Sequence, residues 1–70
     1  MLQFSDIISR VSALGPHWGV RLSFLQGDHT NWSVNINNGR NWFPVTGEIL
    51  EAVFEESLSR AEAFMKEGVR

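Results

Sequence analysis

The stretch of residues 31–45 constrains the fold most, because it has the pattern of a β-hairpin. Trp32, Val34 and Ile36 alternate with serine and asparagine, which is the period-two pattern of a half-buried strand. We therefore expect a strand over residues 31–37. Its apolar side chains should face the core, and its polar side chains should face solvent.

The turn of this hairpin is marked by Asn38 and Gly39. This dipeptide is typical of a two-residue type I′ turn, because both central residues of that turn need positive φ. The turn predicts a second strand over residues 40–45 and fixes the register of the hairpin. The expected pairs are Asn37 with Arg40, Ile36 with Asn41, Val34 with Phe43, and Trp32 with Val45.

Two segments outside the hairpin have apolar residues every three or four positions, and each is predicted to be a helix. They are residues 3–14 and residues 47–67. We expect Ser5 or Asp6 to cap the first helix and Thr46 to cap the second. The apolar positions are Phe4, Ile7, Ile8, Val11 and Leu14 in the first helix, and Leu50, Val53, Phe54, Ser57, Leu58, Ala61, Phe64 and Met65 in the second.

Residues 18–26 alternate again and predict a further strand, with Phe24 opposite Trp32. Pro44 cannot donate to a sheet ladder, so its strand should lie at an edge. The chain is thus predicted to be one small domain over residues 1–70, of the α+β class. The expected order is α-β-β-β-α: a three-stranded antiparallel meander with two helices packed on one face. The other face of the sheet is left to solvent.

Composition narrows the classes of function. The 70 residues contain no cysteine, which excludes disulfides and thiolate metal sites. The net charge of −2 conceals an asymmetry: residues 1–46 carry +1 and residues 47–67 carry −4. A single lysine argues against nucleic acid as a partner. The chain lacks a signal peptide pattern and any apolar run of about 20 residues, so we expect a cytoplasmic protein without a membrane segment.

The solvent-facing side of the sheet is the first candidate binding surface. A tryptophan beside arginine and asparagine is typical of an interaction hot spot. The alternative is that a bulge at Pro44 turns the tryptophan toward the rim of the core. The residues we expect on this surface to contact a partner are Arg21, Asn35, Arg40 and Trp42.

The second candidate is a row of carboxylates along one side of the predicted second helix. Such a row could mimic the phosphate backbone of a nucleic acid and occupy a basic groove of a partner. The alternative is an ordinary solvated helix face. The residues of this row are Glu48, Glu51, Glu55 and Glu62.

Catalysis and metal binding have weak support. His17 and His29 both fall in predicted loops and have no convincing third ligand. No Ser-His-Asp spacing, phosphate-binding loop or dinucleotide-binding motif is present. We therefore expect no catalytic residue, no metal and no cofactor.

The order α-β-β-β-α resembles that of the double-stranded-RNA-binding domain, whose members carry a histidine where this chain has His29. That family grips phosphates through lysines at the start of its second helix, where this chain reads Gly-Glu-Ile-Leu-Glu over residues 47–51. The tryptophan-rich strands, followed by a Glu/Ala/Arg-patterned helix, also resemble small bacteriophage accessory proteins of the anti-CRISPR kind. That second resemblance implies a small, acidic, non-enzymatic binder.

The sequence as a whole favours a non-enzymatic protein-interaction module, encoded by a phage, that binds and inhibits a larger host defence protein. One alternative is a nucleic-acid-binding module that uses Arg21, Arg40, Trp42 and His29. Another is a structural subunit that forms a homodimer through the solvent-facing side or an edge of the sheet.

Overall fold

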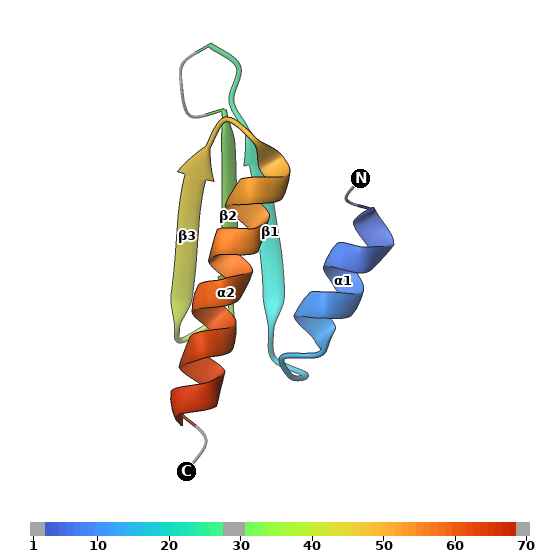
Figure 1. Cartoon of the computed structure of the whole chain (residues 1–70), viewed down its shortest axis with the longest axis vertical. Coiled ribbons are helices and arrows are strands. Elements are labelled where there is room, and N and C mark those ends of the chain that lie inside the picture. The colour runs from blue at the N-terminus through green and yellow to red at the C-terminus, as the bar shows by residue number, and fades with distance from the viewer. Residues whose placement is uncertain (1–2, 28–30, 69–70) are drawn as a thin grey trace.

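The computed structural model describes residues 3–27 and 31–68, and its elements follow the order α-β-β-β-α (Figure 1). The predicted α+β class is confirmed. The elements are α1 (Phe4–Ser12), β1 (Gly19–Phe24), β2 (Trp32–Asn37), β3 (Trp42–Gly47) and α2 (Leu50–Gly68). Neither helix, over its described length, is both long and apolar enough to cross a lipid bilayer.

The three strands form an antiparallel sheet in the order β1-β2-β3. Phe24 lies opposite Trp32, as predicted, and their rings are 4.8 Å apart between centroids. Pro44 lies on the edge strand β3, which also agrees with the prediction. The sheet is therefore the predicted meander, with β2 in the centre.

The predicted two-residue turn between β2 and β3 is wrong. The loop covers residues 38–41, and the register of the two strands is shifted by two residues from the predicted one. Asn37 lies opposite Trp42 rather than Arg40, and Val34 lies opposite Val45 rather than Phe43. A type I′ turn needs positive φ at both central residues, but in the described chain positive φ occurs only at glycines, including Gly39 at +88°.

The Asn38 side chain accounts for the longer loop of residues 38–41. Its Oδ1 accepts hydrogen bonds from the backbone N–H groups of Arg40 (2.9 Å) and Asn41 (2.7 Å). The strand β3 consequently begins at Trp42 instead of residue 40. Because a shift of two residues preserves side-chain parity, every residue of β3 keeps its predicted face.

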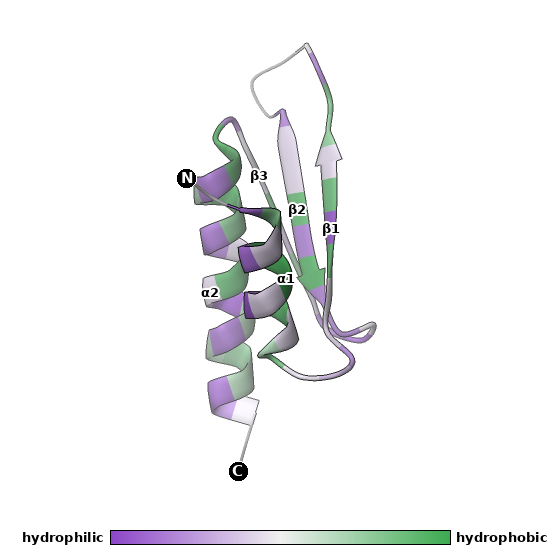
Figure 2. Cartoon of the chain, turned by 90° about the vertical axis from the view of Figure 1, so that its right-hand side faces the viewer, coloured by the Kyte–Doolittle hydropathy of each residue, from purple (hydrophilic) through white to green (hydrophobic). Residues whose placement is uncertain are grey.

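Both helices lie on the same face of the sheet (Figure 2). α2 packs over β2 and β3, and α1 lies beside it over the β1 side (Figure 1). Phe54, Leu58 and Ile36 are completely buried between α2 and the sheet, and each such burial contributes about 1.5–3 kcal/mol. The full set of buried apolar residues is Ile7, Val11, Val34, Ile36, Val45, Val53, Phe54, Leu58 and Ala61.

Ser57 is buried among these apolar residues and joins α2 to the sheet. Its hydroxyl donates to the carbonyl of Phe43 and accepts from the N–H of Ile36 at 3.3 Å. Its place in the core-facing stripe of the helix is as predicted. Serine is more often exposed than buried in folded proteins, but Ser57 is completely buried.

α2 begins at Leu50, three residues later than predicted, because Thr46 and Gly47 continue β3. Thr46 pairs with Ser33 within the sheet, so the prediction that it caps the helix is wrong. Gly47 is required by close packing. A Cβ there would lie 2.7 Å from the side chain of Val53, closer than real side-chain contacts allow.

α1 is shorter than predicted, and its N-cap is Gln3, which makes no side-chain capping bond. The prediction that Ser5 or Asp6 caps it is therefore wrong. Only part of its apolar stripe is buried: Ile7 is buried, whereas Phe4 remains 68% exposed. The reason is that α1 lies toward the β1 edge of the sheet rather than across its centre (Figure 1), so Ile8 also remains exposed.

Candidate functional site

The sheet face opposite the helices is bare in the described structure (Figure 2). We call it the open face. The register places its side chains in three rows that cross all three strands. The rows are Gly19, Asn37 and Trp42; Arg21, Asn35 and Pro44; and Ser23, Ser33 and Thr46.

Trp42 is the large apolar side chain of the open face and is 52% exposed. The alternative that a bulge at Pro44 turns Trp42 toward the core has no support, because β2 and β3 pair residue for residue from Trp42 to Gly47. An indole combines a large flat apolar surface with one N–H donor, which suits it to contacts that are partly apolar and partly polar.

Asn35 lies in the centre of the open face, between Arg21 on β1 and Pro44 on β3. Its Oδ1 is shielded from solvent and has no hydrogen-bond partner among the described residues. Shielding an amide oxygen without a donor is unfavourable by about 1–3 kcal/mol. The amide would gain a hydrogen bond if it turned outward to a donor on a bound partner.

Arg21 is exposed on β1 and supplies the positive charge of the open face. Arg40 does not belong to this face, contrary to the prediction. The corrected register places it in the loop of residues 38–41, where it lines a pocket with His17 and Trp18 at the end of the sheet. The open face thus keeps three of its four predicted residues: Arg21, Asn35 and Trp42.

The predicted acidic row is divided by the fold. Glu51, Glu55 and Glu62 lie on α2, but Glu48 precedes the helix, which begins at Leu50. The exposed carboxylate of Glu55 forms a two-armed ion pair with Arg10 of α1, with one arm at 3.0 Å. The hydrogen bond from Arg10 holds the pKa of Glu55 below its usual range.

Arg10 is the residue that sequence reasoning missed. The hydrogen bond to Glu55 raises the pKa of Arg10, and the charge of Glu62 adds to this effect. The guanidinium carbon also lies 5.7 Å from the centre of the Phe54 ring, so the cation is held above the core. No sequence signal indicates this contact, since it depends on how the two helices lie side by side.

The histidines give no metal site within the described chain. His17 lines the pocket at the end of the sheet, and His29 falls outside the described residues. Over residues 3–27 and 31–68, no group of three or more potential ligands is close enough to hold a metal ion.

No protein-family model, curated protein or solved structure matches this chain significantly. The resemblances to phage accessory proteins and to the double-stranded-RNA-binding domain therefore stay predictions from the sequence.

Proposed function

We propose that this chain is a non-enzymatic protein-interaction module that binds a larger partner protein through the open face. The observation that carries the proposal is the half-exposed Trp42 on a sheet face that no described helix covers. Tryptophan and arginine are the residue types most enriched at interaction hot spots, and this face presents one of each.

The polar residues around Trp42 suit a reversible interface. Serine, threonine and asparagine provide donors and acceptors along all three rows, and Asn35 has an amide oxygen without a donor. A partner with an apolar pocket for the indole and a donor for Asn35 would bury a mixed surface of this kind. Arg21 favours a carboxylate on that partner.

Mimicry of nucleic acid by the acidic helix has less support than binding through the open face. Glu55 is paired with Arg10, and Glu56 is paired with Arg60 at 2.6 Å. Charge mimicry requires carboxylates that are available to a basic groove. Of these two residues, only Glu55 belongs to the predicted acidic row, and it already contacts a cation of the same chain. We therefore assign the binding role to Trp42 and its neighbours rather than to α2.

The inhibition of a host defence protein, with the chain acting in the host cytoplasm, extends this proposal. It is based on the sequence resemblance to phage accessory proteins alone. The nucleic-acid alternative is weakened because Arg21 and Arg40 lie on different surfaces. A basic stripe is what phosphate binding would require.

The proposal is tested with the tagged chain as bait in nuclease-treated host lysate. Trp42→Ser is compared with Phe4→Ser, which removes an exposed aromatic ring from α1 and leaves the open face unchanged. We expect a stoichiometric protein to be captured by the wild type and by Phe4→Ser, but to be lost with Trp42→Ser. Equal capture by Trp42→Ser contradicts the proposal.

The two alternatives give different results in the same experiment. A second sample of the same lysate is left without nuclease. Capture that occurs in the untreated sample and disappears in the nuclease-treated one would indicate nucleic acid as the ligand. A homodimer would appear as twice the monomer mass when the purified chain is sedimented. If either result is obtained and no other protein is captured, the proposed function is overturned.

A further inference from the structure

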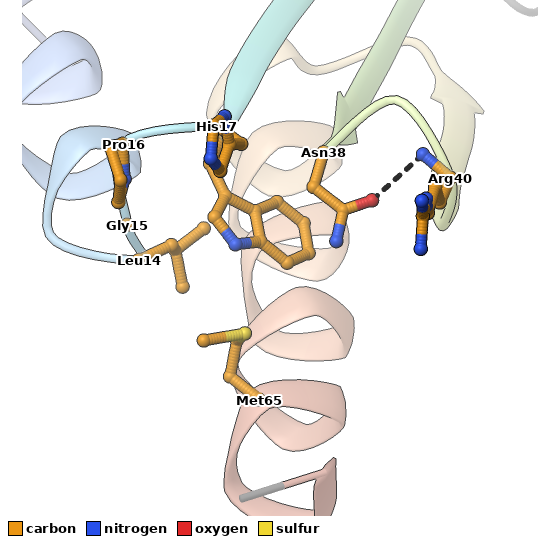
Figure 3. Close-up of a pocket in the computed structure, with 8 residues that line it drawn as sticks. Leu14, Gly15, Pro16, His17, Asn38, Arg40 and Met65 are labelled. Carbon is orange, nitrogen blue, oxygen red and sulfur yellow. Dashed lines mark hydrogen bonds between the residues drawn. The ribbon is translucent and has the colours of Figure 1, made fainter.

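A pocket of about 580 Å³ lies at the end of the sheet, separate from the open face. Three segments form it: the connection between α1 and β1, the loop between β2 and β3, and the last turns of α2 (Figure 3). Its volume falls in the range of small-molecule sites, about 300–1,000 Å³. The lining residues are Leu14, Gly15, Pro16, His17, Trp18, Asn38, Arg40 and Met65.

The apolar wall of the pocket is held in place by the core. Trp18 stacks against Phe43 with ring centroids 6.0 Å apart, and it meets Phe64 edge-on at 6.4 Å. These contacts fix an indole that is only half-buried, so the remainder of its surface faces the pocket. Leu14 and Met65 complete this wall.

Gly15 allows the indole to lie this close to the connection. Its φ is +146°, which favours glycine, and a Cβ at this position would lie 3.2 Å from the Trp18 ring. The backbone of the connection and the ring therefore fit together only with glycine here. The Trp18 part of the apolar wall is thus held in place by the fold.

The rim of the pocket is polar and positively charged. Arg40 and His17 are exposed on it, and no carboxylate of the described residues pairs with Arg40. The Asn38 side chain directs its oxygen to the backbone N–H of Arg40, which leaves its amide nitrogen available as a donor (Figure 3). Of the acidic residues that the structure describes, none lines this pocket.

We propose that this pocket binds a carboxylate attached to an apolar group. The apolar group would lie against Trp18, Leu14 and Met65, and the carboxylate would accept hydrogen bonds from Arg40, with His17 and Asn38 as further donors. The shared chemistry fits a free aromatic acid or the C-terminal carboxylate of a peptide that ends in an apolar residue.

The test is a titration of the isotope-labelled full chain, followed by NMR. Indole-3-acetate is the first probe, and indole-3-acetamide is its neutral control. We expect the acid to shift the Trp18 indole N–H signal and the backbone signals of residues 38–40, with a Kd on the order of 1 mM for a ligand of this size. The amide should bind about tenfold more weakly, because it lacks the charge that Arg40 recognises.

Two variants separate the pocket from a general charge effect. Arg40→Gln should weaken the acid about tenfold, whereas Arg21→Gln removes an arginine from the open face and should leave its affinity unchanged. Arg40→Gln should fold normally, since Asn38 bonds the backbone rather than the side chain of Arg40. Equal effects of the two variants, equal binding of acid and amide, or no binding of either would overturn the proposal.

A second arm distinguishes the two sources of the carboxylate. An acetylated tripeptide ending in Phe is compared with the same peptide as its C-terminal amide. Tighter binding of the peptide acid than of indole-3-acetate assigns the pocket to the chain ends of proteins. Tighter binding of indole-3-acetate assigns it to small aromatic acids, and both results support a carboxylate site.

Discussion

Arg10 of α1 and Glu55 of α2 form a two-armed ion pair between residues that are 45 positions apart in the chain. The pair connects the two helices, and the Arg10 guanidinium also lies over the ring of Phe54. Glu55 of the predicted acidic row is therefore paired with a cation of the same chain.

Arg10→Gln should lower the free energy of unfolding by about 0.5–1 kcal/mol, because both partners are exposed and solvent screens their attraction. Urea denaturation measures the change. Arg60→Gln is the matched control, since it breaks the exposed pair with Glu56 within one helix and should have an effect of no more than about 0.5 kcal/mol. A larger effect of Arg60→Gln than of Arg10→Gln would contradict the role given to Arg10.

The lowered pKa of Glu55 predicts how this contact depends on pH. The hydrogen bond from Arg10 keeps the folded-state pKa below the ordinary 4.5, so its stabilisation is complete above that pH. It is lost as the pH falls through the folded-state pKa. The stability difference between the wild type and Glu55→Gln should therefore be present at about pH 6 and should shrink as the pH falls below 4.5. A difference that is constant with pH would show that the charge of Glu55 does not matter.

Ser57→Ala should destabilise the fold by about 1–3 kcal/mol, because it removes the hydroxyl that contacts Phe43 and Ile36 and leaves buried backbone groups without this bond. Thermal unfolding followed by circular dichroism measures the effect. Ser59→Ala, at an exposed position of the same helix, should change stability by less than about 0.5 kcal/mol. Similar midpoints for the two variants would show that the buried hydroxyl contributes little.

Asn38→Ala should destabilise the hairpin by about 1 kcal/mol, because the loop loses the acceptor for the N–H groups of Arg40 and Asn41. Asn38→Asp keeps that acceptor and should restore most of the stability. Denaturant unfolding of the three proteins measures this order. If Asn38→Asp is as unstable as Asn38→Ala, the side-chain oxygen does not hold the loop.

The order of elements and the faces of the strands could be predicted, because both follow from local periodicity. Val34 and Ile36 are buried and Trp42 is exposed, as their alternation indicates. The register of β2 and β3 could not be predicted from the turn dipeptide. The register depends on whether Asn38 adopts positive φ or accepts hydrogen bonds from the loop with its side chain. The Asn-Gly dipeptide is compatible with both.

The predictions that were wrong concern features that depend on how the helices and strands pack together. α2 begins later than predicted because Thr46 and Gly47 continue β3, where Gly47 packs closely against Val53, a contact between strand and helix that local sequence does not encode. The position of Arg40 at the pocket followed from the register, and the pairing of Arg10 followed from the placement of α1. Sequence periodicity identifies which side of a helix is apolar, but not which neighbour covers it.

The most direct test of the open face as a binding surface is calorimetric titration of the captured partner with the wild type, Trp42→Ser and Phe4→Ser. The thermal midpoint of each protein is measured alongside. Trp42→Ser should weaken binding at least about tenfold with an unchanged midpoint, because its side chain lies away from the core, and Phe4→Ser should bind like the wild type. Unchanged affinity of Trp42→Ser, or a collapse of its thermal midpoint, would contradict the assignment of Trp42 to a binding surface.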